Sequence, residues 1–270
     1  MYYTIIAERA KKLAGQAAAK GGTDMSQTSL GVEWLGQAVF IYRFPSGLVI
    51  CVDPYLSYAA SGGKSRERLL PVLVAPSHLA ADLVITTHDH TDHFDEMSLR
   101  PLAERTDTLF LGPTSCREHW LAMEMPPARF LALDQGQTLE AAGARLTALP
   151  AEHSSGAKRD AIGILIEAEG YRLYQVGDSE YTPAVLEAAT DLRPDLMAVP
   201  INGRLGNMDH QQAALLAQAT QPRVVVPMHY GMFRNNNADP QDFVSAARAI
   251  GLPSRIAIMK PGRRFDLEPA

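Results

Sequence analysis

Short apolar runs, broken by glycine, proline and polar residues, follow one another along the chain from Gly31 onwards. Runs rich in Val, Ile, Leu, Phe and Tyr between such breaks predict β-strands. In the first half, the predicted strands are 32–35, 39–42, 48–52, 82–86 and 108–111. In the second half, they are 129–133, 144–149, 162–168, 172–176, 196–199 and 223–226. The pattern therefore predicts a protein rich in β-sheet.

Helices are predicted between these strands, and a leader helix is predicted ahead of them. The helices between strands are expected at 95–104, after Pro113, at 183–189, and from an N-cap at Asp209 to Ala219. Residues 1–24 are expected to form the leader helix, and residues 25–270 a single domain. Both halves show sheet-rich segments with helices interspersed in the same order. We therefore expect an α/β fold, an αββα sandwich of two mixed β-sheets with helices on the outer faces.

The composition is typical of a soluble globular protein. Hydrophobic residues make up 46% of the 270 positions, and the net charge of −5 gives no broad attraction to nucleic acid or anionic lipid. No apolar run approaches the ~18 residues of a membrane span. Only two cysteines are present, and the first residues lack the order of a secretory signal. We therefore expect a cytoplasmic protein that binds neither nucleic acid nor membranes.

A dense group of metal-ligand side chains follows the strand predicted at 82–86. Within seven residues, the segment after this strand holds His88, His90, Asp92 and His93. Imidazole and carboxylate groups bind zinc, manganese and iron, and loops at strand ends are where such ligands converge. A solvated polar loop would not need to consist almost solely of ligand-type residues. Because neighbouring side chains of a turn point in different directions, this segment can serve two ions.

Three further ligand-type residues each come shortly after an apolar run. His153, Asp178 and His229 follow the predicted strands that end at positions 149, 176 and 226. Alone, a histidine after a strand is more often a structural residue than a ligand. Four strands that each lead into a ligand-type side chain indicate one common metal site.

The order of these residues, with Asp53 ahead of them, resembles the motif series of the metallo-β-lactamase superfamily from about Gly31 to the C-terminus. The resemblance implies two divalent metal ions, zinc or manganese, with iron as a further option. It also implies the ligands: His88, His90 and His153 for the first ion, Asp92, His93 and His229 for the second, and Asp178 as the bridge between them. Asp53 is expected to orient ligands from outside the coordination sphere.

Within this superfamily, the sequence is most similar to L-ascorbate-6-phosphate lactonase and its relatives. The similarity lies in segments 33–36, 51–53, 87–90, 111–116, 177–181 and 236–241. The chain is shorter than that lactonase, and it carries His153 where the lactonase lacks a clear histidine. The resemblance implies lactonase-like chemistry.

The resemblance and the ligand set together predict a dinuclear hydrolase. Two ions about 3.5–4 Å apart lower the pKa of a bridging water to about 7, and the resulting hydroxide would attack a carbonyl or phosphoryl centre. Asp92 is expected to bind metal and also to orient this nucleophile. Arginine matches carboxylate and phosphate groups. Arg204 and Arg234, together with Asn202 and Tyr230, are therefore candidates to bind a small anionic substrate such as a lactone.

Two other functions stay open at this level. The same fold also includes phosphodiesterases and nucleases, although the sequence shows neither a basic stretch nor an inserted domain for gripping nucleic acid. A metal-binding scaffold or sensor without turnover is the second alternative, which the complete set of ligand-type residues disfavours. Relatives of this kind often assemble, so the sequence is compatible with a homo-oligomer, and segment 1–24 is a candidate contact.

Overall fold

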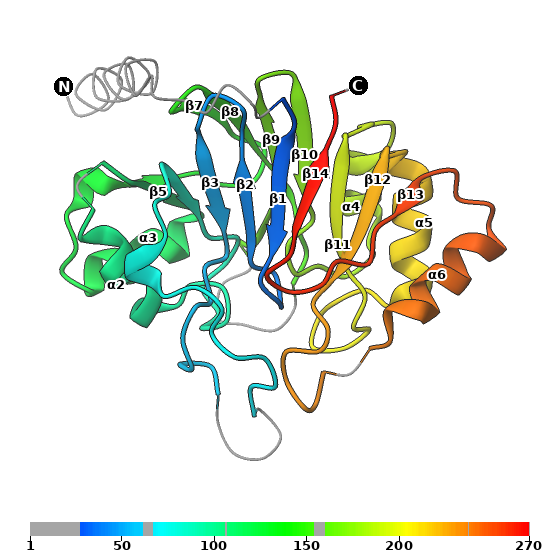
Figure 1. Cartoon of the computed structure of the whole chain (residues 1–270), viewed down its shortest axis with the longest axis horizontal. Helices are drawn as coiled ribbons and strands as arrows, with labels where there is room; N and C mark the ends of the chain where they lie inside the picture. The colour runs from blue at the N-terminus through cyan, green and yellow to red at the C-terminus, as the bar shows by residue number, and fades with distance from the viewer. Residues whose placement is uncertain (1–27, 62–66, 106, 154–159, 237, 270) are drawn as a thin grey trace.

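Two seven-stranded β-sheets lie face to face, with helices on their outer sides (Figure 1). The computed structural model describes residues 28–61, 67–105, 107–153, 160–236 and 238–269. Both sheets are mixed, because each contains antiparallel and parallel neighbours. The predicted αββα sandwich is confirmed. The leader helix predicted at 1–24 lies outside the described residues.

The first sheet has the strand order β14-β1-β2-β3-β4-β5-β6. Its strands are β1 (Leu30–Trp34), β2 (Phe40–Arg43), β3 (Val49–Val52), β4 (Leu83–Ile85), β5 (Leu109–Gly112), β6 (Phe130–Ala132) and β14 (Arg264–Leu267). The strands from β14 to β3 pair antiparallel, and those from β3 to β6 pair parallel. Helices α2 (Glu96–Ala103) and α3 (Thr114–Ala122) lie beside this sheet, and α3 packs on β5 and β6.

The second sheet has the strand order β13-β12-β11-β10-β9-β8-β7. Its strands are β7 (Thr138–Ala141), β8 (Ala144–Pro150), β9 (Ile162–Ala168), β10 (Tyr171–Gln175), β11 (Leu196–Pro200), β12 (Val224–Met228) and β13 (Arg255–Ile256). Its helices are α4 (Pro183–Ala189), α5 (His210–Thr220) and α6 (Pro240–Ala249). Helix α4 packs on β8, and helix α5 packs on β11. Two short 3-10 helices, η1 (Pro76–His78) and η2 (Pro127–Arg129), complete the described elements.

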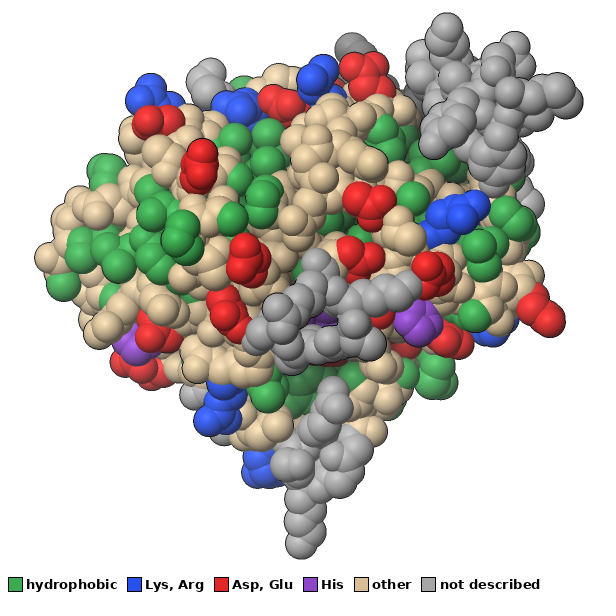
Figure 2. Space-filling model, turned by 180° about the vertical axis from the view of Figure 1, so that it is seen from behind, with side chains coloured by type: hydrophobic (Ala, Val, Ile, Leu, Met, Phe, Trp, Pro, Cys, Tyr) green, Lys and Arg blue, Asp and Glu red, His purple; other side chains and the backbone are tan. Residues whose placement is uncertain are grey.

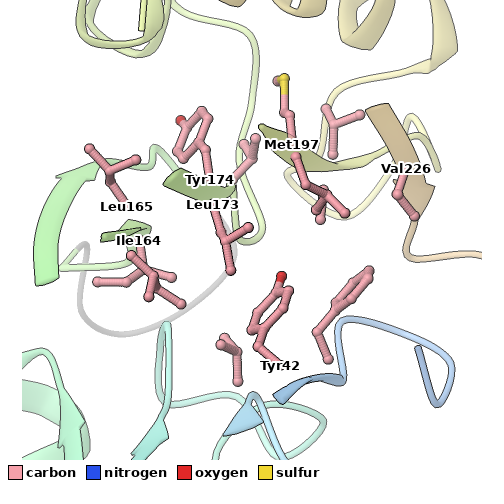
Figure 3. Packing of buried hydrophobic residues seen from close by; sticks show 14 of the residues in the cluster. Tyr42, Ile164, Leu165, Leu173, Tyr174, Met197 and Val226 are labelled. Atoms are coloured by element: carbon pink, nitrogen blue, oxygen red, sulfur yellow. The ribbon is translucent and has the colours of Figure 1, made fainter. Parts of the chain in front are cut away.

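The main hydrophobic core fills the space between the two sheets and continues under the helices of the second sheet, where it includes Leu216 of α5 and Phe243 of α6 (Figure 3). Successive side chains of a strand point to opposite faces, so a strand that is covered on both sides is apolar throughout. In β2, Tyr42 belongs to the core between the sheets, where Ile164 and Leu173 of the second sheet also lie. Its neighbour Ile41 belongs to a second cluster, which includes Trp120 of α3. This double burial explains why the central strands β3, β4 and β5 have no alternating polar face.

The parallel strands direct their carboxyl ends to one edge of the sandwich. β8 and β10 are each antiparallel to β9 and therefore run in the same direction, and β11 and β12 continue this direction. In the first sheet, β3 and β4 are parallel in the same way. The loops that follow β3, β4, β8, β10 and β12 carry Asp53 and the predicted metal ligands. The topology therefore gathers these loops at one edge.

Most predicted elements are confirmed, and β9 and α4 have the predicted bounds. Asp209 is the N-cap of α5, where its side chain and that of Gln212 form a capping box. Strands β7, β13 and β14 and helix α6 were not predicted, because three of them are short and partly exposed and α6 follows a polar loop. In the described ranges, no helix is long and apolar enough to cross a membrane.

Charged side chains are mixed on the face of the molecule that Figure 2 shows. Acidic and basic groups are scattered over its described surface, and the Lys and Arg side chains there form no broad patch. A basic patch or stripe is the electrostatic footprint of a nucleic-acid-binding protein. This face of the described chain offers no such footprint.

Candidate metal centre

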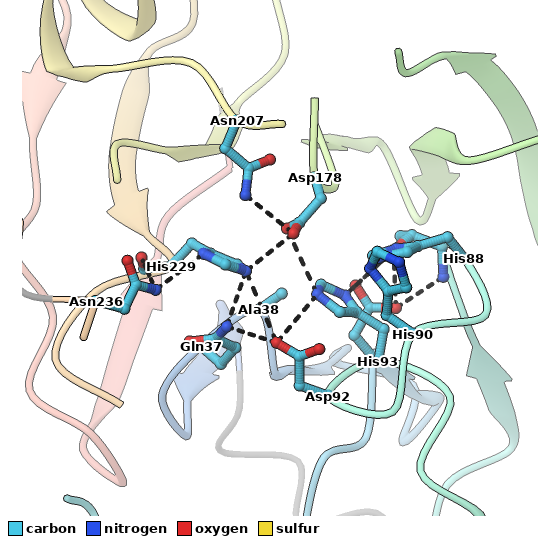
Figure 4. Close-up of polar contacts among 12 residues, drawn as sticks. Gln37, Ala38, His88, His90, Asp92, His93, Asp178, Asn207, His229 and Asn236 are labelled. Carbon is cyan, nitrogen blue, oxygen red and sulfur yellow. Dashed lines mark hydrogen bonds and ion pairs between the residues drawn. The ribbon is translucent and has the colours of Figure 1, made fainter. Parts of the chain in front are cut away.

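The seven residues predicted to bind metal lie together at the gathered loops (Figure 4). Three overlapping groups have ligand atoms within 4.8 Å of one another: His88, His90 and His153; His88, His93 and Asp178; and Asp92, His93 and His229. The first and third groups match the two ligand sets that the resemblance implies. Below, His88, His90 and His153 are called the first ligand group, and Asp92, His93 and His229 the second ligand group.

Three imidazole nitrogens face one another in the first ligand group. His90 Nδ1 lies 2.9 Å from His88 Nε2 and 3.2 Å from His153 Nε2. Burial lowers the pKa of His88 well below its usual value, and burial and the neighbouring His153 lower the pKa of His90. These two rings are therefore neutral at physiological pH and offer lone pairs. In its neutral form, His153 donates Nδ1–H to the Gly206 carbonyl oxygen at 2.9 Å, which leaves its Nε2 unprotonated.

Asp178 connects the two ligand groups. Its Oδ2 lies 3.0 Å from His229 Nε2 and 3.9 Å from His153 Nε2, and its Oδ1 lies 3.5 Å from His93 Nε2. Asp92 Oδ2 lies 3.9 Å from His93 Nε2 and 4.0 Å from His229 Nε2. One carboxylate thus lies close to donors of both groups, which is the position that a bridging ligand needs.

Two buried atoms at the centre of this arrangement, His93 Nε2 and Asp178 Oδ1, have no hydrogen-bond partner among the described residues. A buried polar atom without a partner costs about 1–3 kcal/mol, and more when it is charged. A cation between these two atoms would satisfy both. Imidazole and carboxylate are donors that suit zinc, manganese and iron. The residues therefore fit a divalent metal ion.

Asp53 contacts His93 on the side of the ring that faces away from the second ligand group. Asp53 is fully buried and accepts hydrogen bonds from Thr87 N at 2.7 Å and Thr87 Oγ1 at 2.9 Å. Its Oδ2 also lies 2.9 Å from His93 Nδ1. With the ring proton on Nδ1, the lone pair of His93 Nε2 points into the second ligand group. The ligand-orienting role of Asp53 stays a prediction, which this contact supports.

The carboxylates and imidazoles of the centre shift one another's pKa values. Burial raises the pKa of Asp178, but His229 and His93 outweigh burial and hold this pKa well below its usual value. Burial lowers the pKa of His93, but Asp178, Asp53 and Asp92 hold it well above its usual value. The buried carboxylates therefore stabilise positive charge at this position, carried by a proton or by a metal ion.

Three amide side chains contact the ligands, and sequence reasoning did not find them. Gln37 Nε2 donates to Asp92 Oδ2 at 2.7 Å, and Asn207 Nδ2 donates to Asp178 Oδ2 at 3.0 Å. Asn236 Nδ2 lies 3.2 Å from Nδ1 of His229. All three lie in loops, and amides in loops are too common to indicate a site. Gln37 lies between two predicted strands, and Asn236 begins one of the segments that resemble the lactonase group, but neither signal identified a contact with a ligand.

The four residues predicted to bind substrate have different surroundings. Arg234 Nε and Nη2 donate to one carboxylate oxygen of Glu67 at 3.0 and 2.7 Å, and Arg204 donates to the carbonyl oxygen of Asn235. Both arginines are exposed and hold contacts outside the ligand groups. Asn202 Oδ1 and the Tyr230 hydroxyl are buried, and neither has a hydrogen-bond partner in the described part of the chain. Substrate binding by these four residues stays a prediction.

Two mixed sheets with outer helices, and a histidine- and aspartate-rich centre at one edge, define a metallo-β-lactamase fold. Residues 31–229 match the family described as the beta-lactamase superfamily domain. The chain belongs to this family.

Relatives of similar length have been named from several organisms. The chain is 26% identical over 243 residues to a UPF0173 metal-dependent hydrolase of Methanopyrus kandleri, covering 87% of this chain and 99% of the relative. It is 29% identical over 254 residues to a metal-dependent hydrolase of Rubrobacter xylanophilus, covering 89% and 99%. Among solved structures, Igni18, a metallo hydrolase from Ignicoccus hospitalis, is similar with a TM-score of 0.71 and 26% identity, covering 89% of this chain and 99% of that chain.

Proposed function

We propose that this chain is a dinuclear metal-dependent hydrolase that acts on a small anionic substrate such as a lactone. The observation that carries the proposal is the pair His93 Nε2 and Asp178 Oδ1. These buried atoms lie 3.5 Å apart without a hydrogen bond among the described residues, and His88, His93 and Asp178 form a group that shares one residue with each of the two ligand groups. The names of the relatives, metal-dependent hydrolases, support the reaction class. The resemblance of several sequence segments to the lactonase group motivates the cyclic ester.

The chain's own residues prepare the centre for this chemistry. When bound, two divalent ions supply an ionised water at neutral pH and polarise a substrate oxygen. His153 and His93 each have one ring nitrogen bonded to an outer partner, so the other nitrogen presents a lone pair without rearrangement. This preorganisation reduces the cost of assembling the centre, and Asp178 fixes the spacing of the two groups.

Asp92 is the residue we assign to orient the attacking water. Burial raises its pKa, but His93 and His229 outweigh burial and keep the carboxyl ionised. Its side chain is 14% exposed, compared with 5% for Asp178, so Asp92 is the ligand carboxylate more open to water and substrate. An ionised, accessible carboxylate can accept a hydrogen bond from the attacking water and hold it in line.

The anionic character of the proposed substrate is supported by the chemistry of the metal ions. Each divalent cation can bind a negatively charged oxygen of a substrate directly, which supports an anionic group at the loaded centre. Asn202 Oδ1 and the Tyr230 hydroxyl lack partners among the described residues, but both atoms are buried, so neighbouring groups would have to move before either could meet a substrate. Arg204 and Arg234 would have to exchange their present contacts for such a role.

Metal analysis and a substrate panel test this proposal. We expect the wild-type protein to bind two ions per chain, His88→Ala or Asp178→Ala to lose one or both, and the exposed His78→Ala to keep both. A panel of charged and uncharged lactones, a phosphodiester and a thioester should show turnover that is highest for a charged lactone. Unchanged metal content in both ligand variants would overturn the site. No turnover of any substrate with both ions bound would favour a scaffold or sensor.

A further inference from the structure

Gln37 is fixed in a turn that points its side chain into the second ligand group. The residue lies between β1 and β2 and has a positive φ of 50°. Its backbone carbonyl oxygen accepts hydrogen bonds from Trp34 Nε1 and from His229 N, both at 3.0 Å. The residue is only 1% exposed. These contacts attach the turn to the loop of His229, so the amide of Gln37 has a defined position (Figure 4).

The amide nitrogen of Gln37 lies between two atoms that belong to the second ligand group. Gln37 Nε2 is 2.7 Å from Asp92 Oδ2 and 2.8 Å from His229 Nε2. A bound ion would use the lone pair of His229 Nε2, which then could not accept a hydrogen bond from the amide. The N–H groups would also point their positive ends at a cation. This orientation of the amide is therefore unfavourable beside an ion.

The other end of the same amide has no partner. Gln37 Oε1 is buried and makes no hydrogen bond to any residue that the structure describes. The two ends of a glutamine amide have nearly the same shape, and a half turn about the last side-chain bond exchanges them. After this turn, the oxygen lies where the nitrogen was, 2.7 and 2.8 Å from the two ligand atoms.

These separations suit two neighbouring ligands on one ion. Ligands at a right angle, each about 2.1 Å from the ion, are about 3.0 Å apart. A carbonyl oxygen at this position also has its negative end toward the cation. We propose that Gln37 Oε1 is an additional ligand of the second metal ion. This inference rests on the proposed dinuclear function.

The extra ligand changes the metal that the second site prefers. With Gln37, the site has five protein donors, the others being Asp92, His93, His229 and the shared Asp178. Structural and catalytic zinc sites usually have three or four protein ligands in tetrahedral geometry, whereas manganese and iron accept six-coordinate sites rich in oxygen. A sixth place then remains for water or substrate. The second site therefore favours manganese or iron over zinc.

Metal titration of three variants tests the inference on the full chain. Metal per chain is measured by mass spectrometry at buffered free Mn²⁺. We expect Gln37→Leu to weaken the second ion at least tenfold and to leave the first unchanged, whereas Gln37→Glu, which keeps an oxygen donor, retains both. Gln218→Leu is the control, because Gln218 bonds the Ile250 carbonyl oxygen between α5 and α6. Wild-type affinity for both ions in Gln37→Leu, or equal loss in Gln37→Glu, would overturn the assignment.

A crystal structure of the manganese-loaded wild-type protein gives a second, independent test that needs no variant to fold. An oxygen of Gln37 at about 2.1 Å from the second ion would support the inference. Two ions with the Gln37 nitrogen still on Asp92 would overturn it and leave the dinuclear function intact. A wild-type protein that binds a single ion would overturn the dinuclear function itself, and the two failures are thereby distinguished.

Discussion

Replacing Asp53 by asparagine should reverse the proton position on His93 while preserving the shape of the site. The backbone N–H of Thr87 donates to Asp53 Oδ1 at 2.7 Å, so an asparagine must keep its oxygen there. Its NH₂ group then replaces Oδ2, which lies 2.9 Å from His93 Nδ1. An NH₂ group donates to Nδ1, and the ring proton moves to Nε2. Nε2 is the atom that faces Asp178 in the second ligand group.

The magnitude follows from this contact. Losing the outer partner of a ligating histidine typically weakens metal binding about 10–100-fold, which is about 1.4–2.8 kcal/mol. Asp53→Asn should fall at the upper end for the second ion, because it removes the partner and also protonates the ligating nitrogen. His88 belongs to the first group and is linked to Asp53 only through the Thr87 hydroxyl, which lies 3.1 Å from His88 Nδ1 and 2.9 Å from Asp53 Oδ2. The first ion should therefore be affected much less than the second.

Competition between the metal-depleted protein and a chromophoric chelator at neutral pH measures both affinities. Asp195→Asn is the matched control, because Asp195 is also buried but accepts from Arg172 N and pairs with Arg223 in the second sheet. Circular dichroism reports whether each variant is folded. An unchanged affinity for the second ion in a folded Asp53→Asn protein would refute the reasoning about the ring proton.

Three further predictions follow. Since the pKa of His93 is held well above its usual value, binding of the second ion should release a proton and become tighter as pH rises. Calorimetry in two buffers with different ionisation enthalpies measures this proton release, and its absence would contradict the prediction. Gly177→Ala should lower the free energy of unfolding by more than about 1 kcal/mol in denaturant titration, because its φ is +72° and a Cβ would lie 2.7 Å from the Ile162 carbonyl oxygen. Gly170→Ala is the control: its φ is +82° but its Cβ would meet open space, so it should lower the free energy of unfolding less. Burial raises the pKa of Tyr230 to about 12, so the stability that its neutral hydroxyl contributes is present below the unfolded pKa near 10 and is lost as pH rises through 12. Unfolding titrations of Tyr230→Phe should show a smaller loss of stability over this pH range. An equal loss in both proteins would contradict this prediction.

The ligand positions were predictable because each is tied to a local pattern. The apolar run of β12 ends at Met228, and His229 follows directly, so the side chain had to lie at a strand end. The same logic placed Asp178 after β10 and the histidine-rich segment after β4. Apolar periodicity fixes the strand, and the parallel topology then determines which loops meet. The first step needs only local sequence, whereas the sorting of these residues into ligand sets came from the family resemblance, because strand pairing joins distant residues.

The amides and the arginines were not predictable in this way. Gln37 reads in the sequence as an ordinary turn residue, and its importance comes from a contact with Asp92 across 55 positions of sequence. Arg234 was a candidate for an anionic substrate, but it lies beside Glu67, which is far away in the sequence. The partner of a long polar side chain depends on tertiary placement and on competing partners. A pattern of residue types contains neither.

The two ligand groups differ in charge, and this difference separates two effects that act on the second ion. The first group consists of imidazoles, of which His88 and His90 are neutral, so little proton competition is expected there near neutral pH. In the second group, an ion must displace the proton that the carboxylates stabilise on His93. That competition vanishes once the pH exceeds the raised pKa, whereas an amide such as Gln37 does not titrate. A difference between wild type and Gln37→Leu that persists at high pH must therefore come from the amide itself, because by then His93 has lost its proton in both proteins.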